Sequence, residues 1–218
     1  MTDINSYLLD NRVIFIGSRI TDDVRVYARA GRAKTERETH QKKKKKTPHP
    51  QKPILFFFHQ VTCRVVAALL AMEALDPAAE ITMYINASGG SPYSVVAILD
   101  VMAAIAPPIR TVAFGQVATA PAALLAAGTK GRRYAMPSTR IMLYQPIGGA
   151  EGSADEVNIT TAELHRTMRL LNAFLSRFTG RSEGALERES DRPNCMSAEQ
   201  AVKFGLIDHV MKSMKGQR

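Results

Sequence analysis

GQVATAPAALLAAG, residues 115–128, is the stretch that decides the fold. Pro121 stands where the first turn of a helix tolerates proline, and Gly128 stands where a helix C-terminal cap is expected. The pattern predicts a sharp turn from a strand into a helix, with Thr119 at the corner. Hydrolases keep their nucleophile at such an elbow. The stretch therefore predicts either an active site or a backbone that has the geometry of an active site without its chemistry.

Strand-like runs and helical patterns alternate on both sides of this elbow, as in an α/β layered domain. The strand-like runs are 13–17, 81–86, 110–114 and 140–144. The helical patterns are 65–75, 94–105 and 121–127.

A longer helix is expected after residue 152, because Ser153 and Glu156 have the spacing of a capping box and Gly180 can end the helix. It carries one apolar stripe: Val157, Leu164, Met168, Leu171, Leu175 and Phe178. The stripe either covers the domain's own core or packs against a partner helix, and the periodicity leaves both open.

Charge is concentrated in one segment. Between Arg25 and Lys52 there are eleven Lys or Arg against two Glu, which accounts for the whole net charge of +9. The rest of the chain has no basic face, which argues against nucleic-acid binding.

No apolar stretch has the length of a membrane span, so no membrane contact is expected. Cys63 and Cys195 have no nearby ligand set, so no metal or cofactor is expected.

Residues 24–60 interrupt a helix start. Thr21 is a natural N-cap and Asp22 and Asp23 suit a first turn, yet the apolar helix begins only near Val61. Without 24–60 the chain reads ITDDVTCRVVAALLAMEALDP, a capped amphipathic helix. We interpret 24–60 as an insertion, either a basic surface loop or a translated intron.

Four motifs occur in a fixed order: YINASGGS (84–91), GQVATAP (115–121), MPSTRIMLYQPIGG (136–149) and MSAEQAVKFGLID (196–208). Together they resemble the proteolytic subunit of the Clp protease, the ClpP family of serine peptidases. The resemblance covers the chain from about Tyr7 to Val210, apart from the insertion. It implies a ClpP/crotonase-like α/β layered fold, a single domain over 1–218 with a protruding long handle helix in the region 146–178.

The family's Ser-His-Asp triad is changed at all three matching positions. Its elbow reads G-Q-A-A-S-M-G and its next motif M-I-H-Q-P, which places Thr119 at the Ser and Tyr144 at the His position. The Asp position is Pro193. Gly89, Gly90 and the backbone N–H of Ala120 match the oxyanion-hole positions, whereas Pro121 replaces the family's usual Gly and removes one nearby donor. The resemblance thus implies that the oxyanion-hole positions are retained although the catalytic triad is lost.

The triad changes make the chain similar to the ClpR group, the triad-lacking paralogues of cyanobacteria and plastids. That resemblance implies a non-catalytic structural subunit in mixed heptameric rings with active ClpP-type and other ClpR-type subunits. Two rings would meet through 146–178 and its apolar stripe, and an Hsp100-type ATPase would feed in unfolded proteins. The plastid stroma is the expected location, with cyanobacterial cytoplasm as the alternative.

Two other functions remain open at this point. An active peptidase would use Thr119 as nucleophile with an unrecognised base, although His165 and His209 are expected at the surface. A crotonase-like acyl-CoA enzyme would use the glycine-rich oxyanion architecture instead.

The insertion has a direct test in tryptic peptides of the native protein. If 24–60 is a translated intron, a peptide will join Asp23 directly to Val61, and the mature protein will be near neutral in charge. A peptide containing YARAGR or TPHPQKPILFFFHQ would show instead that the segment is present in the protein.

Overall fold

The computed structural model describes residues 4–20, 61–145 and 152–211. The insertion 24–60 and the first residues of the predicted region 146–178 lie outside the described residues. The helices are α1 (Ile4–Asp10), α3 (Val61–Leu75), α4 (Pro92–Ala104), α5 (Ala120–Ala126), α6 (Ala154–Thr179), α7 (Glu183–Ser190) and α8 (Ala198–Phe204). The strands are β1 (Val13–Ile16), β2 (Ile81–Ile85), β3 (Ile109–Ala113), β4 (Gln116–Ala118), β5 (Arg133–Ala135), β6 (Arg140–Leu143), β7 (Asn194–Ser197) and β8 (His209–Val210).

A five-stranded sheet in the order β1-β2-β3-β5-β8 forms the main layer, and all of its pairs are parallel. Parallel neighbours need crossover connections, which α3 and α4 supply between β1, β2 and β3. In β2 the side chains alternate between buried and partly buried, as expected for a strand whose two faces differ. The predicted α/β layered fold is confirmed.

A second, three-stranded sheet has the order β4-β6-β7, in which β4 and β6 are parallel and β6 and β7 antiparallel. Its first strand follows β3 after only two residues, Phe114 and Gly115. The chain therefore passes directly from the large sheet to the small one, and α5 begins where β4 ends.

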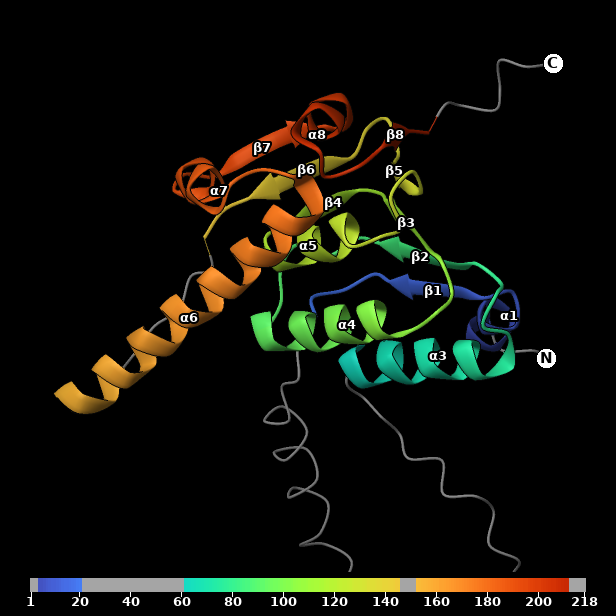
Figure 1. Ribbon diagram of the computed structural model, residues 1–218, viewed down its shortest axis with the longest axis horizontal. Coiled ribbons are helices and arrows are strands. Elements are labelled where there is room, and N and C mark those ends of the chain that lie inside the picture. The colour runs from blue at the N-terminus through green and yellow to red at the C-terminus, as the bar shows by residue number, and fades with distance from the viewer. Residues whose placement is uncertain (1–3, 21–60, 146–151, 212–218) are drawn as a thin grey trace, which may run out of the picture.

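The helix α5 is buried on every side, from Ala120 to Ala126, which explains its lack of polar residues. Figure 1 shows α3 and α4 side by side below the large sheet, with α5 between the two sheets. Gly128 does not cap α5 in a left-handed conformation, because the C-cap is Ala127. A Cβ at Gly128 would lie 2.4 Å from the Thr111 hydroxyl oxygen, so close packing is what requires glycine there.

The helix α6 begins and ends as predicted. Ser153 and Glu156 form a capping box, and Gly180 ends the helix in the left-handed conformation with φ of 76°. No described helix has a segment that is long and apolar enough to span a bilayer. In Figure 1 the N-terminal part of α6 extends away from the rest of the molecule.

The stripe on α6 divides into two parts. Leu171 and Leu175 are only 5% and 8% exposed and belong to the chain's own core. The chain's own core thus covers most of both side chains, and their role as ring-ring contacts stays a prediction. Phe178 is partly buried against the same core, whereas Val157, Leu164 and Met168 keep part of their surface accessible.

A buried ion pair joins the C-terminal ends of several elements. Arg133 is 4% exposed, and its Nη2 and Nε donate to the two carboxylate oxygens of Asp208 at 2.6 and 2.9 Å. The Arg133 Nη1 lies within hydrogen-bond distance of the carbonyl oxygens of Ala126, Phe178 and Gly205. One guanidinium thus ties α5, α6 and the end of α8 to β5 and the start of β8.

The electrostatics of this pair favour the ionised form of Asp208. Burial opposes ionisation, but the hydrogen bonds and charge of Arg133, with the N–H of Gly131, hold the pKa of Asp208 below its usual value. A carboxyl whose pKa is lower in the folded state stabilises the fold above its unfolded pKa. That contribution is lost as the pH falls through the folded pKa.

Replacing Asp208 by Asn will lower the free energy of unfolding by about 3 kcal/mol, because Arg133 keeps its charge in the interior without a counter-charge. Urea denaturation at neutral pH measures this effect, and the variant will also lose part of the acid dependence of stability. The control is Glu189→Gln, which breaks the more exposed Arg181 pair (2.7 Å) and will cost less than about 1 kcal/mol. Equal losses in the two variants would contradict the account.

Candidate active site

Thr119 occupies a strained backbone conformation at the predicted elbow, with φ of 60° and ψ of −122°. Among the described non-glycine residues, only Arg12 shares a positive φ. A β-branched residue in this region is a marked outlier, and such conformations persist only where surrounding structure enforces them. The elbow geometry is therefore built by the rest of the fold and is not a local preference of threonine.

Backbone hydrogen bonds hold the elbow on three sides. The Thr119 N–H donates to the Met142 carbonyl of β6 at 2.8 Å, and its own carbonyl accepts from the Ala122 N–H at 3.0 Å. One residue earlier, the Ala118 N–H donates to the Ala87 carbonyl at 3.0 Å. The corner is thus tied to the small sheet, to α5 and to the segment that leads from β2 into the glycine pair.

The Thr119 hydroxyl has no hydrogen-bond partner among the described residues, although its oxygen is buried. It lies at a cavity of about 30 Å³. The cavity can hold one or two water molecules, and it is far smaller than the roughly 150 Å³ that holds benzene in an apolar site. Its described lining is Thr119, Ala120, Ala123, Leu143, Tyr144, Gln145, Met168, Leu171, Asn172, Leu175, Leu186 and Ser190.

The structure brings together two of the three positions that match the triad. Tyr144 lines the same cavity as Thr119, but Pro193 is exposed in the link between α7 and β7 and is not part of the lining. No His, Asp, Glu or Lys occurs among the described residues of the lining. A threonine hydroxyl needs a base to become a nucleophile, and this cavity offers none from the described part of the chain.

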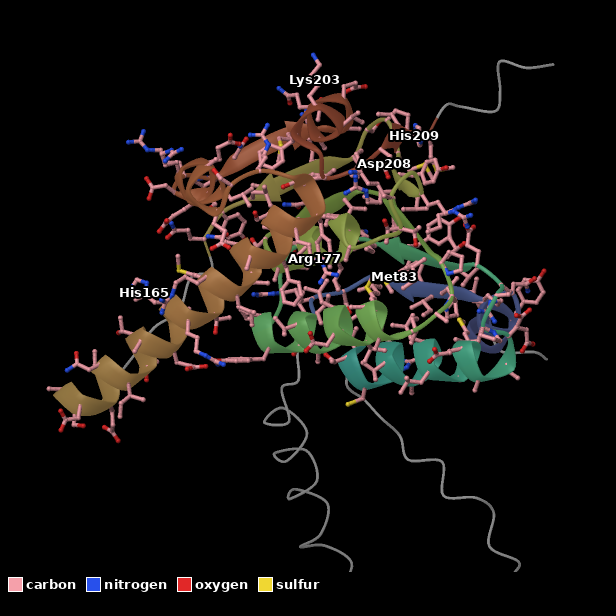
Figure 2. All side chains as sticks on the ribbon, viewed as in Figure 1. Met83, His165, Arg177, Lys203, Asp208 and His209 are labelled. Atoms are coloured by element: carbon pink, nitrogen blue, oxygen red, sulfur yellow. The ribbon has the colours of Figure 1, made fainter. Side chains whose placement is uncertain are left out.

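The described histidines lie elsewhere. His165 is exposed on the outer part of α6, and Figure 2 shows it well away from the centre of the molecule. His209 is exposed on β8, where its ring lies 5.4 Å from that of Tyr134. Neither lines the cavity, which agrees with the surface positions expected for them.

The glycine pair has a structural reason of its own. A Cβ at Gly90 would lie 2.4 Å from the Ile20 carbonyl oxygen, so the two backbones approach too closely for any side chain. Around it, the Ile20 N–H donates to the Gly89 carbonyl at 3.2 Å and the Ser91 N–H to the Ile20 carbonyl at 2.7 Å. Gly89 has a φ of 152°, which favours glycine. An oxyanion role for Gly89, Gly90 and Ala120 stays a prediction.

Sequence reasoning missed two contributors to the site. Asn86 follows β2, and its Oδ1 accepts the Gln116 N–H at 3.2 Å, which fixes the start of β4. An Asn directly after a strand was the available signal. The second contributor is the cavity wall that α6 and α7 supply, with Leu171 and Leu186 among its residues. In the sequence, the only indication of this wall was the apolar stripe of α6, and a stripe does not show which residues pack against it.

No group of three or more His, Cys, Asp or Glu in the described segments is placed to hold a metal ion.

The model of the family named Clp protease matches residues 56–214, well over half of the chain. The chain belongs to the Clp protease family. Membership makes it a serine peptidase homologue and a Clp protease-type subunit, and it implies in general terms assembly into ClpP-type rings and partnership with an Hsp100-type ATPase.

The unpartnered hydroxyl of this Clp protease family member can be tested with a pair of matched substitutions. Thr119→Val keeps the shape of the side chain and removes a buried hydroxyl that no described residue hydrogen-bonds, so the free energy of unfolding will rise by about 1 kcal/mol. Thr111→Val is the control, because the buried Thr111 hydroxyl donates to the Leu125 carbonyl at 2.8 Å. That variant will lose about 1 kcal/mol.

Chemical denaturation of both variants gives the two values. Destabilisation of Thr119→Val by as much as Thr111→Val would mean that the Thr119 hydroxyl has a partner in solution. A base in hydrogen-bond contact with Thr119 would be one such partner, and the reading of the site would then have to change.

Proposed function

We propose that this chain is a non-catalytic structural subunit of an ATP-dependent Clp protease complex, of the ClpR type. The observation that supports it most is the combination of an enforced elbow with a buried hydroxyl that has no hydrogen-bond partner among the described residues. Thr119 keeps the backbone conformation of a nucleophile, while the described cavity beside it lacks a basic side chain.

The chemistry of the replacements supports the same function. Tyr144 presents a phenol hydroxyl where the triad has an imidazole, so it brings no basic nitrogen to take the Thr119 proton. Pro193 has no side-chain acceptor that could orient a base. It also lies outside the lining of the cavity, so it does not contact the Thr119 site there. Loss of a single triad member lowers the rate by several orders of magnitude, and here all three are changed.

The shape of α6 supports a role in assembly. Its C-terminal half completes the chain's own core through Leu171 and Leu175. Its N-terminal half leaves Val157 and Leu164 partly exposed on one face, and this face continues the same stripe. An apolar stripe that runs from the core out onto a protruding helix has a natural partner in the matching helix of a second ring.

The remaining parts of the proposal rest on the resemblance to the ClpR group. The chain would occupy mixed heptameric rings with active ClpP-type and other ClpR-type subunits, and an Hsp100-type ATPase would deliver unfolded proteins to the chamber. We place it in the plastid stroma, with cyanobacterial cytoplasm as the alternative.

The competing functions make different demands on the site. A peptidase that uses Thr119 needs a base next to the hydroxyl, and none of the described lining residues provides one. A crotonase-like enzyme needs room for an acyl-CoA beside the glycine pair, and the family match favours the Clp protease family instead.

Co-expression with an active ClpP-type subunit from the same source tests the proposed function. We expect mixed complexes in native mass spectrometry, and no hydrolysis of small fluorogenic peptides by this chain alone. Leu164→Asp will abolish mixed double rings, because a charge replaces a partly exposed residue of the stripe.

The matched control is Ile159→Asp, which changes a 70% exposed residue on the opposite side of α6. It will leave the complexes intact. Peptide hydrolysis by the isolated chain would contradict the catalytic part of the proposal. Full-sized complexes with Leu164→Asp would contradict the role of the stripe.

A further inference from the structure

The N-terminal half of α6 has little to hold it in place. Of residues 154–166, none is buried, and the first buried side chain along the helix is Thr167 at 3% exposure. Short helices are only marginally stable in water without tertiary packing. The direction in which this half leaves the body must therefore be fixed near the turn that contains Thr167.

Tyr93 supplies a contact at this turn. It lies near the start of α4, three residues after Gly90, and its ring is half-exposed. Its hydroxyl donates to the carboxylate of Glu163 on α6. The Thr167 hydroxyl lies 3.2 Å from the Tyr93 oxygen and 2.9 Å from the Glu163 carbonyl oxygen, so its single proton is shared between two acceptors.

This cluster links two elements that are 70 residues apart in the chain. Tyr93 reaches α6 from outside that helix and hydrogen-bonds with the side chains of both Glu163 and Thr167. The Tyr93 hydrogen bond is also the main cause of a lowered pKa of Glu163, which has an i,i+3 partner in Arg166 at 3.1 Å. A carboxylate acceptor makes the Tyr93 bond stronger than one between neutral groups.

We propose that Tyr93 is a positioning residue that fixes the direction of the exposed half of α6 and thereby the apolar face that α6 presents to a second ring. The second half of this statement rests on the proposed function, whereas the first concerns the isolated chain. The geometry places the anchor at the point where α6 changes from buried to exposed. Loss of the anchor therefore releases the outer turns while the C-terminal half stays packed.

Hydrogen exchange on the isolated full-length chain tests the first half. Tyr93→Phe keeps the ring and removes only the hydroxyl, and exchange of the amides in 157–166 will become about three- to tenfold faster. Exchange in the central strands β2 and β3 and the urea midpoint will stay unchanged, which a general loss of stability would not allow. Glu163→Gln retains an acceptor oxygen and will show a smaller increase.

Tyr134→Phe is the matched control, because it removes a phenol hydroxyl from the large sheet, where the ring of Tyr134 lies against His209. It will not change exchange in α6. If Tyr93→Phe leaves exchange in 157–166 at the wild-type rate, the positioning role is overturned.

Assembly with the active ClpP-type subunit tests the second half. Tyr93→Phe will raise the concentration needed for half-maximal assembly by about three- to tenfold, in step with the faster exchange. Faster exchange with unchanged assembly would overturn the link to ring contact. Failure of the wild-type chain to assemble would overturn the proposed function instead, and the exchange data would still decide the role of Tyr93.

Discussion

The hydrogen bond from the Thr119 N–H to the Met142 carbonyl, 2.8 Å long, is the contact on which the site depends. It fixes a β-branched residue at a φ of 60° and joins the start of α5 to the small sheet. Because β4 follows β3 after only two residues, the elbow lies close to the junction of the two sheets. None of this requires a reactive side chain. The backbone of the elbow is therefore held independently of which side chain stands at position 119.

Much of the fold could be predicted because its longer elements follow simple rules. The strands β1, β2 and β3 are rich in β-branched residues, and β6 is mostly apolar. The capping box at Ser153 marks the start of α6 by itself. The strands β4, β5 and β8 were missed because two or three residues are too few for any periodicity to show. The strand β7 (NCMS) was missed because it contains no β-branched residue. Their pairing is decided by distant neighbours and not by local sequence.

The site was predicted less completely than the fold. Thr119 and Tyr144 do lie at one cavity, but Pro193 does not, since a motif match aligns positions without their surroundings. The apolar stripe shows one face of α6, but it does not show that the chain's own core covers Leu171 and Leu175. The same helix is covered by its own core at one end and exposed at the other, a difference that only the tertiary structure shows.

The central claim is that this Clp protease family member keeps an elbow without a catalytic base. Intact-mass analysis of the mixed complex after treatment with a fluorophosphonate tests this most directly, because the active subunits serve as the internal control. Each active subunit will gain one adduct, and this chain will gain none. A stoichiometric adduct on Thr119 would contradict the account.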